Sequence, residues 1–489
     1  MAADSHQLHF ILFPFMAQGH MIPMMDIARL LAHHGMIVTV ITTPLNAQRF
    51  KPIISRDVES GLVIQFIELQ FPGEEAGLPK DCENIDMLPS LGSGNEFFLS
   101  TYRLLEPVQR LLEELNPRPS CIISDMCLPY TSQVARKLGV PRLGFNGLCC
   151  FSQLCMHCIR SSRILESKKS ENEYFVVPGL PDAIELTKDQ LPGAMLHDID
   201  KFHEQIAVAE EVTYGVIINS FEELEAAYAQ EFKKVKRDKV WFIGPVSLFN
   251  KNNSDKVQRG NKSSIEESEC FSWLDSQQPT SVIYVCFGSL CNLITSQLIE
   301  LGSGLEASNR NFIWVLRGGG KSKEIEDWIV EDGFEGRTKG RGLIIRGWAP
   351  QVAILQHPAI GGFLTHCGWN STLEGICAGA PMVTWPLFGD QFFNERLVVD
   401  VLKIGVKVGT EATVTWGMEK KVGILVKREA VTRAIERLME EGEEGEERRK
   451  RAKEFSIKAR AAMEEDGSSY LNMKLLIQDI MMQQKANVE

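Results

Sequence analysis

Two groups of polar residues in this 489-residue chain have the types and spacing needed for chemistry. The first extends from Trp348 to Gln391 and is rich in His, Asn, Ser, Trp and acidic residues. The second consists of His20 and Asp125, each of which follows a short apolar run. A neutral imidazole held by a carboxylate can accept a proton near neutral pH. A histidine alone after a strand is more often only a polar surface residue. The pairing with Asp125 is what makes His20 a candidate base.

A phosphate site is expected where a strand leads into a helix within the first group. The segment 366–371 is a His-Cys-Gly turn followed by Trp and then by Asn370 and Ser371, which are residue types that favour helix N-caps. In a parallel α/β sheet such a turn lies at the carboxyl ends of the strands, where ligands bind. No Lys or Arg occurs between Arg346 and Arg396. We therefore expect backbone N–H groups, the helix dipole and side-chain hydrogen bonds to hold the phosphates.

The elements that must position these residues alternate between strands and helices. Residues 9–13 and 37–41 are apolar or β-branched runs typical of strands, and apolar residues recur at helical spacing over 24–31. A strand, a helix and a second strand in succession predict a βαβ unit and a parallel sheet. The alternation continues to residue 243 and restarts at residue 281. The chain is therefore predicted to be an α/β protein with two doubly wound halves.

A polar stretch divides the two halves. Residues 250–264 are rich in Lys, Asn, Ser and Asp and poor in apolar residues, as in a linker or an exposed loop. We expect one lobe at 1–249, a second at 265–465, and a C-terminal helix at 466–489 that packs back on the first lobe.

Composition and charge exclude several classes of protein. Lys and Arg number 52 and Asp and Glu 64, which gives a net charge of −12 and disfavours nucleic acids and anionic membranes as partners. The N-terminus has no basic region of the kind that opens a secretory signal, and the uncharged stretch 9–25 is interrupted by Pro and Gly, so no membrane span is expected. The 12 scattered cysteines are expected to be free thiols in a reducing compartment.

Three shorter patterns are rejected as cofactor or metal sites. Residues 302–307 match the dinucleotide-binding fingerprint, but they are expected to lie inside a helix rather than to open one after a strand. Asp198-Ile199-Asp200 is only a three-residue match to a metal–diphosphate motif, in a variable-looking loop. The pair Cys155 and Cys158 lacks a second ligand pair at zinc-site spacing. We therefore expect no metal and no nicotinamide cofactor.

The whole stretch from Trp348 to Gln391 resembles the plant signature box of family-1 UDP-dependent glycosyltransferases. The resemblance extends over the chain and includes Phe15–His20 and Ser124-Asp125. It is strongest to plant enzymes of secondary metabolism that glucosylate flavonoids, terpenoids and steroid hormones. It implies the GT-B fold, in which two Rossmann-like lobes enclose an active-site cleft. The first lobe would then bind the acceptor and the second the UDP-sugar.

The resemblance also implies the residues that bind the donor. Trp348 would stack on the uracil ring, Ala349 would meet the edge of that ring through its backbone, and Glu374 would accept both ribose hydroxyls. Gln351 and Gly368 belong to the same binding set. The diphosphate would contact His366, Asn370, Ser371 and Ser289. The sugar would face Trp369, Asp390 and Gln391.

The implied reaction is an inverting transfer of glucose from UDP-glucose to an apolar acceptor hydroxyl, giving a β-glucoside and UDP. His20 would take the proton of the hydroxyl and Asp125 would orient the imidazole. Gln391 is the form associated with glucose in this family, whereas members that prefer galactose often carry histidine there. Relatives often place Ser or Thr in the loop after strand 142–145, whereas this chain has Asn146 and no hydroxyl there.

Other functions remain open on the sequence. A different GT-B activity, such as a sugar-nucleotide epimerase, could use the same fold. A non-catalytic protein that binds apolar small molecules is a second alternative, although a binder has no use for both His20 and Asp125. The resemblance further implies a monomer in the cytoplasm whose partners are the UDP-sugar and the acceptor.

Overall fold

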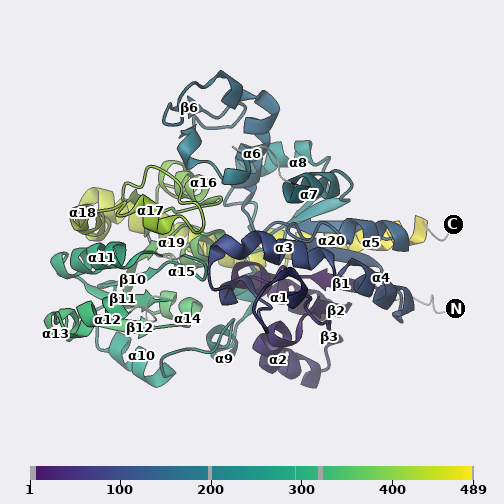
Figure 1. The fold of residues 1–489 in the computed structure, drawn as a ribbon, viewed down its shortest axis with the longest axis horizontal. Coiled ribbons are helices and arrows are strands. Elements are labelled where there is room, and N and C mark those ends of the chain that lie inside the picture. Colours follow the sequence, from purple (N-terminus) through teal and green to yellow (C-terminus); the bar gives the residue numbers. More distant parts are fainter. Residues whose placement is uncertain (1–6, 196–200, 292, 318–322, 487–489) are drawn as a thin grey trace.

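Two parallel β-sheets form the centres of two lobes that lie side by side in the computed structural model (Figure 1). The structure describes residues 7–195, 201–291, 293–317 and 323–486. The N-terminal lobe contains the purple and blue elements of Figure 1, and the C-terminal lobe contains the green ones. Asp198 and Asp200, rejected above as metal ligands, lie outside the described residues.

The sheet of the N-terminal lobe has seven strands in the order β3-β2-β1-β4-β5-β8-β9, all parallel. Its strands are β1 (His9–Phe13), β2 (Ile37–Thr42), β3 (Ile64–Glu68), β4 (Cys121–Asp125), β5 (Arg142–Phe145), β8 (Gly215–Ile218) and β9 (Val240–Phe242). Leu12 of β1 pairs with Val40 on one side and with Ile123 on the other. A separate antiparallel pair joins β6 (Phe175–Val176) to β7 (Glu185–Leu186).

The sheet of the C-terminal lobe has six parallel strands in the order β12-β11-β10-β13-β14-β15. They are β10 (Val282–Cys286), β11 (Asn311–Leu316), β12 (Gly342–Arg346), β13 (Ile360–Thr365), β14 (Met382–Thr384) and β15 (Gly405–Lys407).

Helices connect the strands in both lobes. Those before the linker are α1 (Gln18–His33), α2 (Pro44–Glu59), α3 (Gly94–Tyr102), α4 (Leu105–Glu114), α5 (Thr131–Leu138), α6 (Cys150–Ser162), α7 (Lys201–Glu211) and α8 (Ala226–Val235). Those from the linker onward are α9 (Asn253–Val257), α10 (Glu267–Asp275), α11 (Thr295–Ala307), α12 (Lys323–Val330), α13 (Phe334–Arg337), α14 (Gln351–Leu355), α15 (Trp369–Ala378), α16 (Gln391–Arg396), α17 (Glu419–Val422), α18 (Arg428–Met439), α19 (Glu443–Met463) and α20 (Ser468–Ala486).

The two sheets share one topology, which confirms the predicted fold class of two Rossmann-like lobes. In each sheet the chain runs outward over three strands and then returns to the other side of the first strand. The order reverses between β1 and β4 in one lobe and between β10 and β13 in the other. Ligands of open α/β sheets bind at such switch points, beyond the carboxyl ends of the strands.

The last helix is part of the first lobe's core. Met473, Leu476 and Ile480 of α20 are fully buried in the same apolar cluster as Phe10 of β1. Figure 1 shows α20 in yellow, lying among the blue elements of the N-terminal lobe. The chain therefore crosses back to its first lobe after completing the second.

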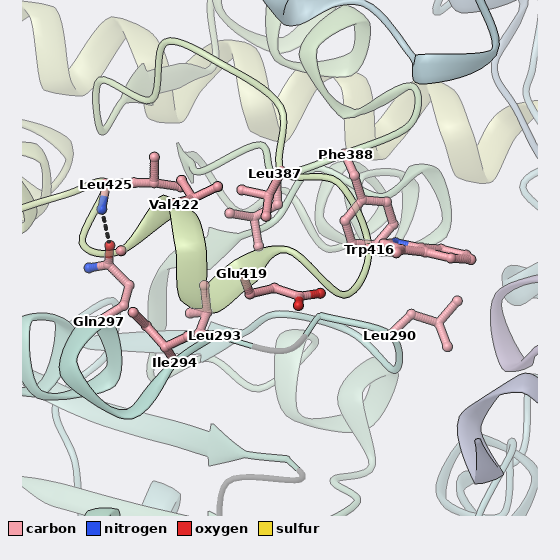
Figure 2. Close-up of a pocket in the computed structure, with 12 residues that line it drawn as sticks. Leu290, Leu293, Ile294, Gln297, Leu387, Phe388, Trp416, Glu419, Val422 and Leu425 are labelled. Carbon is pink, nitrogen blue, oxygen red and sulfur yellow. Dashed lines mark hydrogen bonds between the residues drawn. The ribbon is translucent and has the colours of Figure 1, made fainter. Parts of the chain in front are cut away.

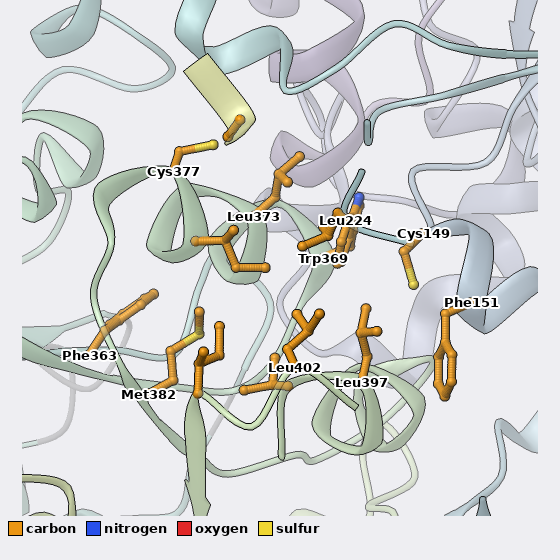
Figure 3. Packing of buried hydrophobic residues seen from close by; sticks show 14 of the residues in the cluster. Cys149, Phe151, Leu224, Phe363, Trp369, Leu373, Cys377, Met382, Leu397 and Leu402 are labelled. Carbon is orange, nitrogen blue, oxygen red and sulfur yellow. The ribbon is translucent and has the colours of Figure 1, made fainter. Parts of the chain in front are cut away.

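A second apolar cluster is shared by both lobes. It joins Cys149, Phe151 and Leu224 of the N-terminal lobe to Trp369 and Leu397 of the C-terminal lobe (Figure 3). The lobes therefore meet through a buried apolar surface in addition to the linker.

Several local expectations can be compared with the structure. Residues 302–307 lie inside α11, as predicted, and all 12 cysteines are free. Helix α8 begins at Ala226, just after the buried Glu225, whose carboxylate accepts hydrogen bonds from Ser220 and from the Phe151 backbone. Within the described ranges, every helix is too short or too polar to span a bilayer.

Candidate active site

A cleft of about 220 Å³ lies where the two switch points face each other. The loops after β1, β10 and β13 all contribute to its wall. The cleft is lined by His20 and by each residue that the sequence predicted for the donor. Those donor residues are Ser289, Trp348, Ala349, Gln351, His366, Gly368, Trp369, Asn370, Ser371, Glu374, Asp390 and Gln391. The fold thus gathers residues that are more than 350 positions apart in the sequence into one cleft.

His20 and Asp125 are brought into contact by neighbouring strands of the first sheet. His20 lies in the first turn of α1 after β1, and Asp125 is the last residue of β4, the strand next to β1. His20 Nδ1 lies 2.7 Å from Asp125 Oδ2, and the aspartate is fully buried while 26% of the histidine side chain is exposed. A carboxylate only accepts, so Nδ1 carries the proton and Nε2 is left as the basic nitrogen.

The surroundings of His20 adjust its acidity. Burial lowers the pKa of the imidazole, but the negative charge of Asp125, the hydrogen bond to it and the charge of Asp390 outweigh burial, so the pKa of His20 is raised above 6.5. Burial raises the pKa of Asp390 to about 6, against a hydrogen bond from Asn394 and the charge of His20. Asp390 comes from the other lobe, so residues of both lobes influence the candidate base.

The residue that caps the N-terminus of α15, in the turn after β13, is not one of those predicted. The N-cap residue is Gly368, with no side-chain cap hydrogen bond, and α15 begins at Trp369. Asn370 and Ser371 therefore lie within the first turn of the helix, and the expectation that they cap it was wrong. Gly368 can serve because its missing side chain leaves room: a Cβ there would lie 2.4 Å from His366 Nε2.

His366 is enclosed by glycines of two switch-point loops. A Cβ on Gly288, which has φ of +71°, would lie 2.6 Å from His366 Cε1. Burial lowers the pKa of His366 to about 4, and its Nδ1 has no hydrogen-bond partner among the described residues. The imidazole is therefore neutral near pH 7 and can offer one N–H donor to an anion, rather than a positive charge.

Glu374 is held by two neighbours. Its Oε1 accepts a hydrogen bond from Arg259 Nη1, and its Oε2 accepts one of 2.7 Å from Gln351 Nε2. Gln351 also donates to Ser371 Oγ at 3.1 Å. The residues predicted to bind ribose and phosphate thus form one hydrogen-bonded set at the start of α15.

Three other residues predicted to bind the UDP-sugar already make hydrogen bonds within the protein. Trp369 is 97% buried, and its indole N–H donates to the Asn219 carbonyl at 2.7 Å, so its side chain is not free to bind a sugar hydroxyl. The Asn370 amide donates to the Gly19 carbonyl, next to His20. Gln391 Oε1 accepts from the backbone N–H groups of residues 387 and 388, which leaves its NH₂ group as the donor.

The cleft contains cations that the sequence reasoning missed. Lys256 and Arg259 of the linker and Arg317 after β11 all line it, so cationic side chains share the cleft with the dipoles and neutral groups expected to hold the phosphates. No motif marks these three residues, because their segments approach the cleft only in the folded chain. Arg317 lies over the Trp348 ring at 4.4 Å, and no described carboxylate lies within ion-pair distance of it.

Asn146 lies in the loop after β5, where a Ser or Thr hydroxyl was expected from the resemblance. It lines the cleft, one residue from Gly147, whose Cβ position would lie 3.8 Å from the His20 ring. Its Nδ2 donates to Gln153 Oε1 at 2.9 Å, and its Oδ1 is buried without a hydrogen-bond partner among the described residues. The Asn146 side chain is therefore fixed by Gln153, and its buried Oδ1 is not exposed to the cleft.

Aromatic side chains adjoin the candidate base. The His20 and Phe15 rings pack edge to face, with their centroids 5.4 Å apart. Phe15 stacks on Phe98 with a centroid distance of 5.2 Å, and the centroids of Phe98 and Phe202 are 4.5 Å apart. Phe98 and Phe202 are only partly buried. This row of rings offers an apolar surface next to His20.

A small apolar pocket in the C-terminal lobe adjoins the same cleft (Figure 2). It is lined mainly by aliphatic side chains of the loop after β10 and of residues 414–425, together with Trp416. Leu290 and Phe388 line both this pocket and the main cleft. Apolar surface therefore extends from the cleft on both lobes.

Family models match both lobes of the chain. Residues 259–439 match the family described as UDP-glucoronosyl and UDP-glucosyl transferase. Residues 6–248 match the glycosyltransferase N-terminal domain.

Relatives and solved structures agree with these matches. The chain is 56% identical to UDP-glycosyltransferase 73C5 of Arabidopsis thaliana over 481 residues, which is 98% of this chain and 97% of that protein. It is similar to the crystal structure of Glycyrrhiza uralensis UGT73P12 complexed with glycyrrhetinic acid 3-O-monoglucuronide, with a TM-score of 0.90, 38% identity and coverage of 99% and 97%. It also resembles Arabidopsis thaliana UGT89C1 complexed with UDP-L-rhamnose, with a TM-score of 0.75, 28% identity and coverage of 98% and 100%.

Proposed function

Since the chain belongs to the family of plant UDP-glycosyltransferases, we propose that it transfers glucose from UDP-glucose to a hydroxyl of an apolar small molecule, with inversion. That it is a UDP-glycosyltransferase follows from the family. The choice of glucose, the apolar acceptor and the inverting course are the proposal. The observation that carries it is the buried Asp125 holding His20 at the edge of the donor cleft.

The proposed reaction is one direct displacement. His20 Nε2 takes the proton of the acceptor hydroxyl while the hydroxyl oxygen attacks the anomeric carbon. The bond from that carbon to the diphosphate breaks, and UDP leaves with the bonding electrons. Attack on the face opposite the leaving group turns the α-linked sugar into a β-glucoside. Asp125 keeps the imidazole oriented and stabilises its protonated form.

The donor would lie along the second switch point. Trp348 would stack on uracil, Glu374 would bind the ribose hydroxyls, and the first turn of α15 with Ser289 would bind the diphosphate. His366 would donate one N–H to the diphosphate, and Lys256 and Arg317 would balance the charge of the departing UDP. Asp390 and the NH₂ group of Gln391 would contact the sugar.

The acceptor would lie against the aromatic side of the cleft. The partly buried rings of Phe98 and Phe202, and the apolar pocket reached past Leu290 and Phe388, support an apolar acceptor. On this proposal the segment 1–249 acts as the acceptor lobe and 265–465 as the donor lobe, with 250–264 as the linker.

A panel of donors and acceptors tests the proposal. UDP-glucose, UDP-galactose and UDP-L-rhamnose would each be supplied with quercetin, glycyrrhetinic acid 3-O-monoglucuronide or a steroid hormone, and products identified by mass spectrometry and NMR. We expect a β-glucoside with at least one acceptor and UDP-glucose as the preferred donor. An α-glucoside formed from UDP-glucose, or preference for another donor, would contradict it. Conversion of labelled UDP-glucose without an acceptor would instead indicate an epimerase.

A further inference from the structure

Arg259 of the linker connects the two lobes through carboxylates. Its side chain is 8% exposed and lies between Asp26 of α1 and Glu374 of α15. Arg259 Nε donates to Asp26 Oδ2 at 2.8 Å, and Nη1 donates to Glu374 Oε1. Each lobe thus contributes one buried acid, and the linker contributes the cation between them.

These contacts leave Glu374 able to bind a ligand. An ionised carboxylate has about four acceptor positions. One is used by Arg259 and one by Gln351, which leaves positions on both oxygens for the two adjacent hydroxyls of a ribose. Arg259 and Gln351 fix the plane and direction of the carboxylate before any ligand arrives, which reduces the cost of binding.

The linker around Arg259 also borders Trp348. A Cβ on Gly260, which has φ of +97°, would lie 2.5 Å from Trp348 Cζ2. Ser264 donates its backbone N–H to the Trp348 carbonyl at 2.8 Å, and its hydroxyl accepts from the Trp348 N–H at 2.8 Å. One short segment of the linker therefore contacts both residues assigned to the nucleoside.

We propose that Arg259 is a positioning residue for the UDP-sugar: it orients Glu374 toward the ribose and, through Asp26, makes donor affinity depend on the N-terminal lobe. This inference rests on the proposed function, because the ribose-binding role of Glu374 is part of that proposal. Asp26 is itself fixed by Asn250 Nδ2, which donates to its Oδ1 at 2.9 Å. The residues that join the lobes would therefore also prepare the donor site.

Arg29 offers a matched control for Arg259. It is likewise buried, with 5% of its side chain exposed, and it pairs with Asp57 and with Asp255 of the same linker. Among the described residues, its ion pairs are with these two aspartates and not with Glu374. A substitution of Arg29 therefore removes two buried ion pairs of the linker, and it can reach Glu374 only indirectly, because Arg29 Nη1 donates to Asn250, which in turn donates to Asp26.

The test measures UDP affinity by calorimetry, steady-state kinetics and thermal unfolding for R259Q, R259K, R29Q, D26N and E374Q. We expect R259Q to weaken UDP binding about tenfold or more and to raise KM for the donor more than it lowers kcat. R259K should recover part of the affinity, because it restores the charge. D26N should weaken UDP binding less than R259Q. R29Q should lower the unfolding temperature and should weaken UDP binding far less than R259Q, because Arg29 reaches Glu374 only through Asn250 and Asp26.

The outcomes separate this inference from the proposed function. If E374Q weakens UDP binding and R259Q does not, Glu374 keeps its role and the inference about Arg259 is wrong. If R259Q binds UDP more tightly than the native chain, Arg259 competes with the ribose and the inference is likewise wrong. If E374Q leaves UDP affinity unchanged, the proposed donor site fails, and the inference fails with it.

Discussion

Single residues in this cleft combine a role predicted from a motif with contacts that no motif reveals. His20 and Asp125 could be paired from the sequence because each follows a strand, and the fold brings them within 2.7 Å. The partners of Trp369 and Gln391 could not be predicted, since Asn219 and the 387–388 backbone reach them only in the folded chain. For the same reason Arg317 was missed.

The acidity of His20 leads to a prediction at this scale. The base must be neutral, so activity falls as pH drops through its pKa, which lies above 6.5 because of Asp125 and Asp390. In D125N the lowering effect of burial remains and the main raising effect is lost. We expect the acid limb of the kcat/KM profile to move to lower pH in D125N, with a lower plateau because the imidazole is less well oriented. An unmoved limb in a D125N enzyme that still binds UDP would contradict the assignment of that limb to His20.

The elements that matter most are the strand-to-helix turns at the two switch points. Their positions were predictable, because the apolar runs that form β1, β4, β10 and β13 are buried on both sides and read clearly in the sequence. The edge strands β3 and β15 gave weaker signals, since β3 is half-exposed and β15 has only three residues. The Gly368 cap was not predicted, because the steric demand of His366 appears only when the turn is folded.

Gly288 tests the packing of these turns. In G288A the new Cβ would displace His366, so we expect UDP affinity to fall and stability to drop by about 1–3 kcal/mol from backbone strain. Gly35 is the control, because it has φ of +80° and a Cβ there would meet no atom within 4 Å. G35A should therefore destabilise the protein without changing UDP affinity. Equal UDP affinities in the two variants, measured by calorimetry, would show that the Gly288 contact is unimportant for the donor.

At the scale of the whole molecule, the linker and the ion pairs that join the two lobes lie next to the proposed active site. The division into two α/β halves and the polar linker could be predicted from composition and alternation. The ion pairs that fix the linker could not be predicted. Asp26, Arg29 and Asp57 belong to helices of the first lobe, and no sequence motif indicates their partners. The net charge of −12 is likewise a poor guide at short range, since cations line the cleft itself.

The return of α20 to the first lobe gives a prediction about overall stability. Leu476 is fully buried in the N-terminal core, whereas its neighbour Leu475 is 55% exposed. We expect L476A to lower the free energy of unfolding by about 2–5 kcal/mol and L475A to change it by less than about 0.5 kcal/mol. Chemical denaturation followed by circular dichroism would measure both. A larger loss in L475A would mean that α20 does not pack as described.

The most direct test of the central claim is the His20→Ala variant, assayed for both turnover and UDP binding. If His20 is the base that deprotonates the acceptor, kcat/KM should fall by about 10²- to 10⁴-fold. UDP affinity should stay nearly unchanged, because the residues proposed to hold the nucleotide lie in the other lobe and the linker. Normal turnover in this variant would contradict the account.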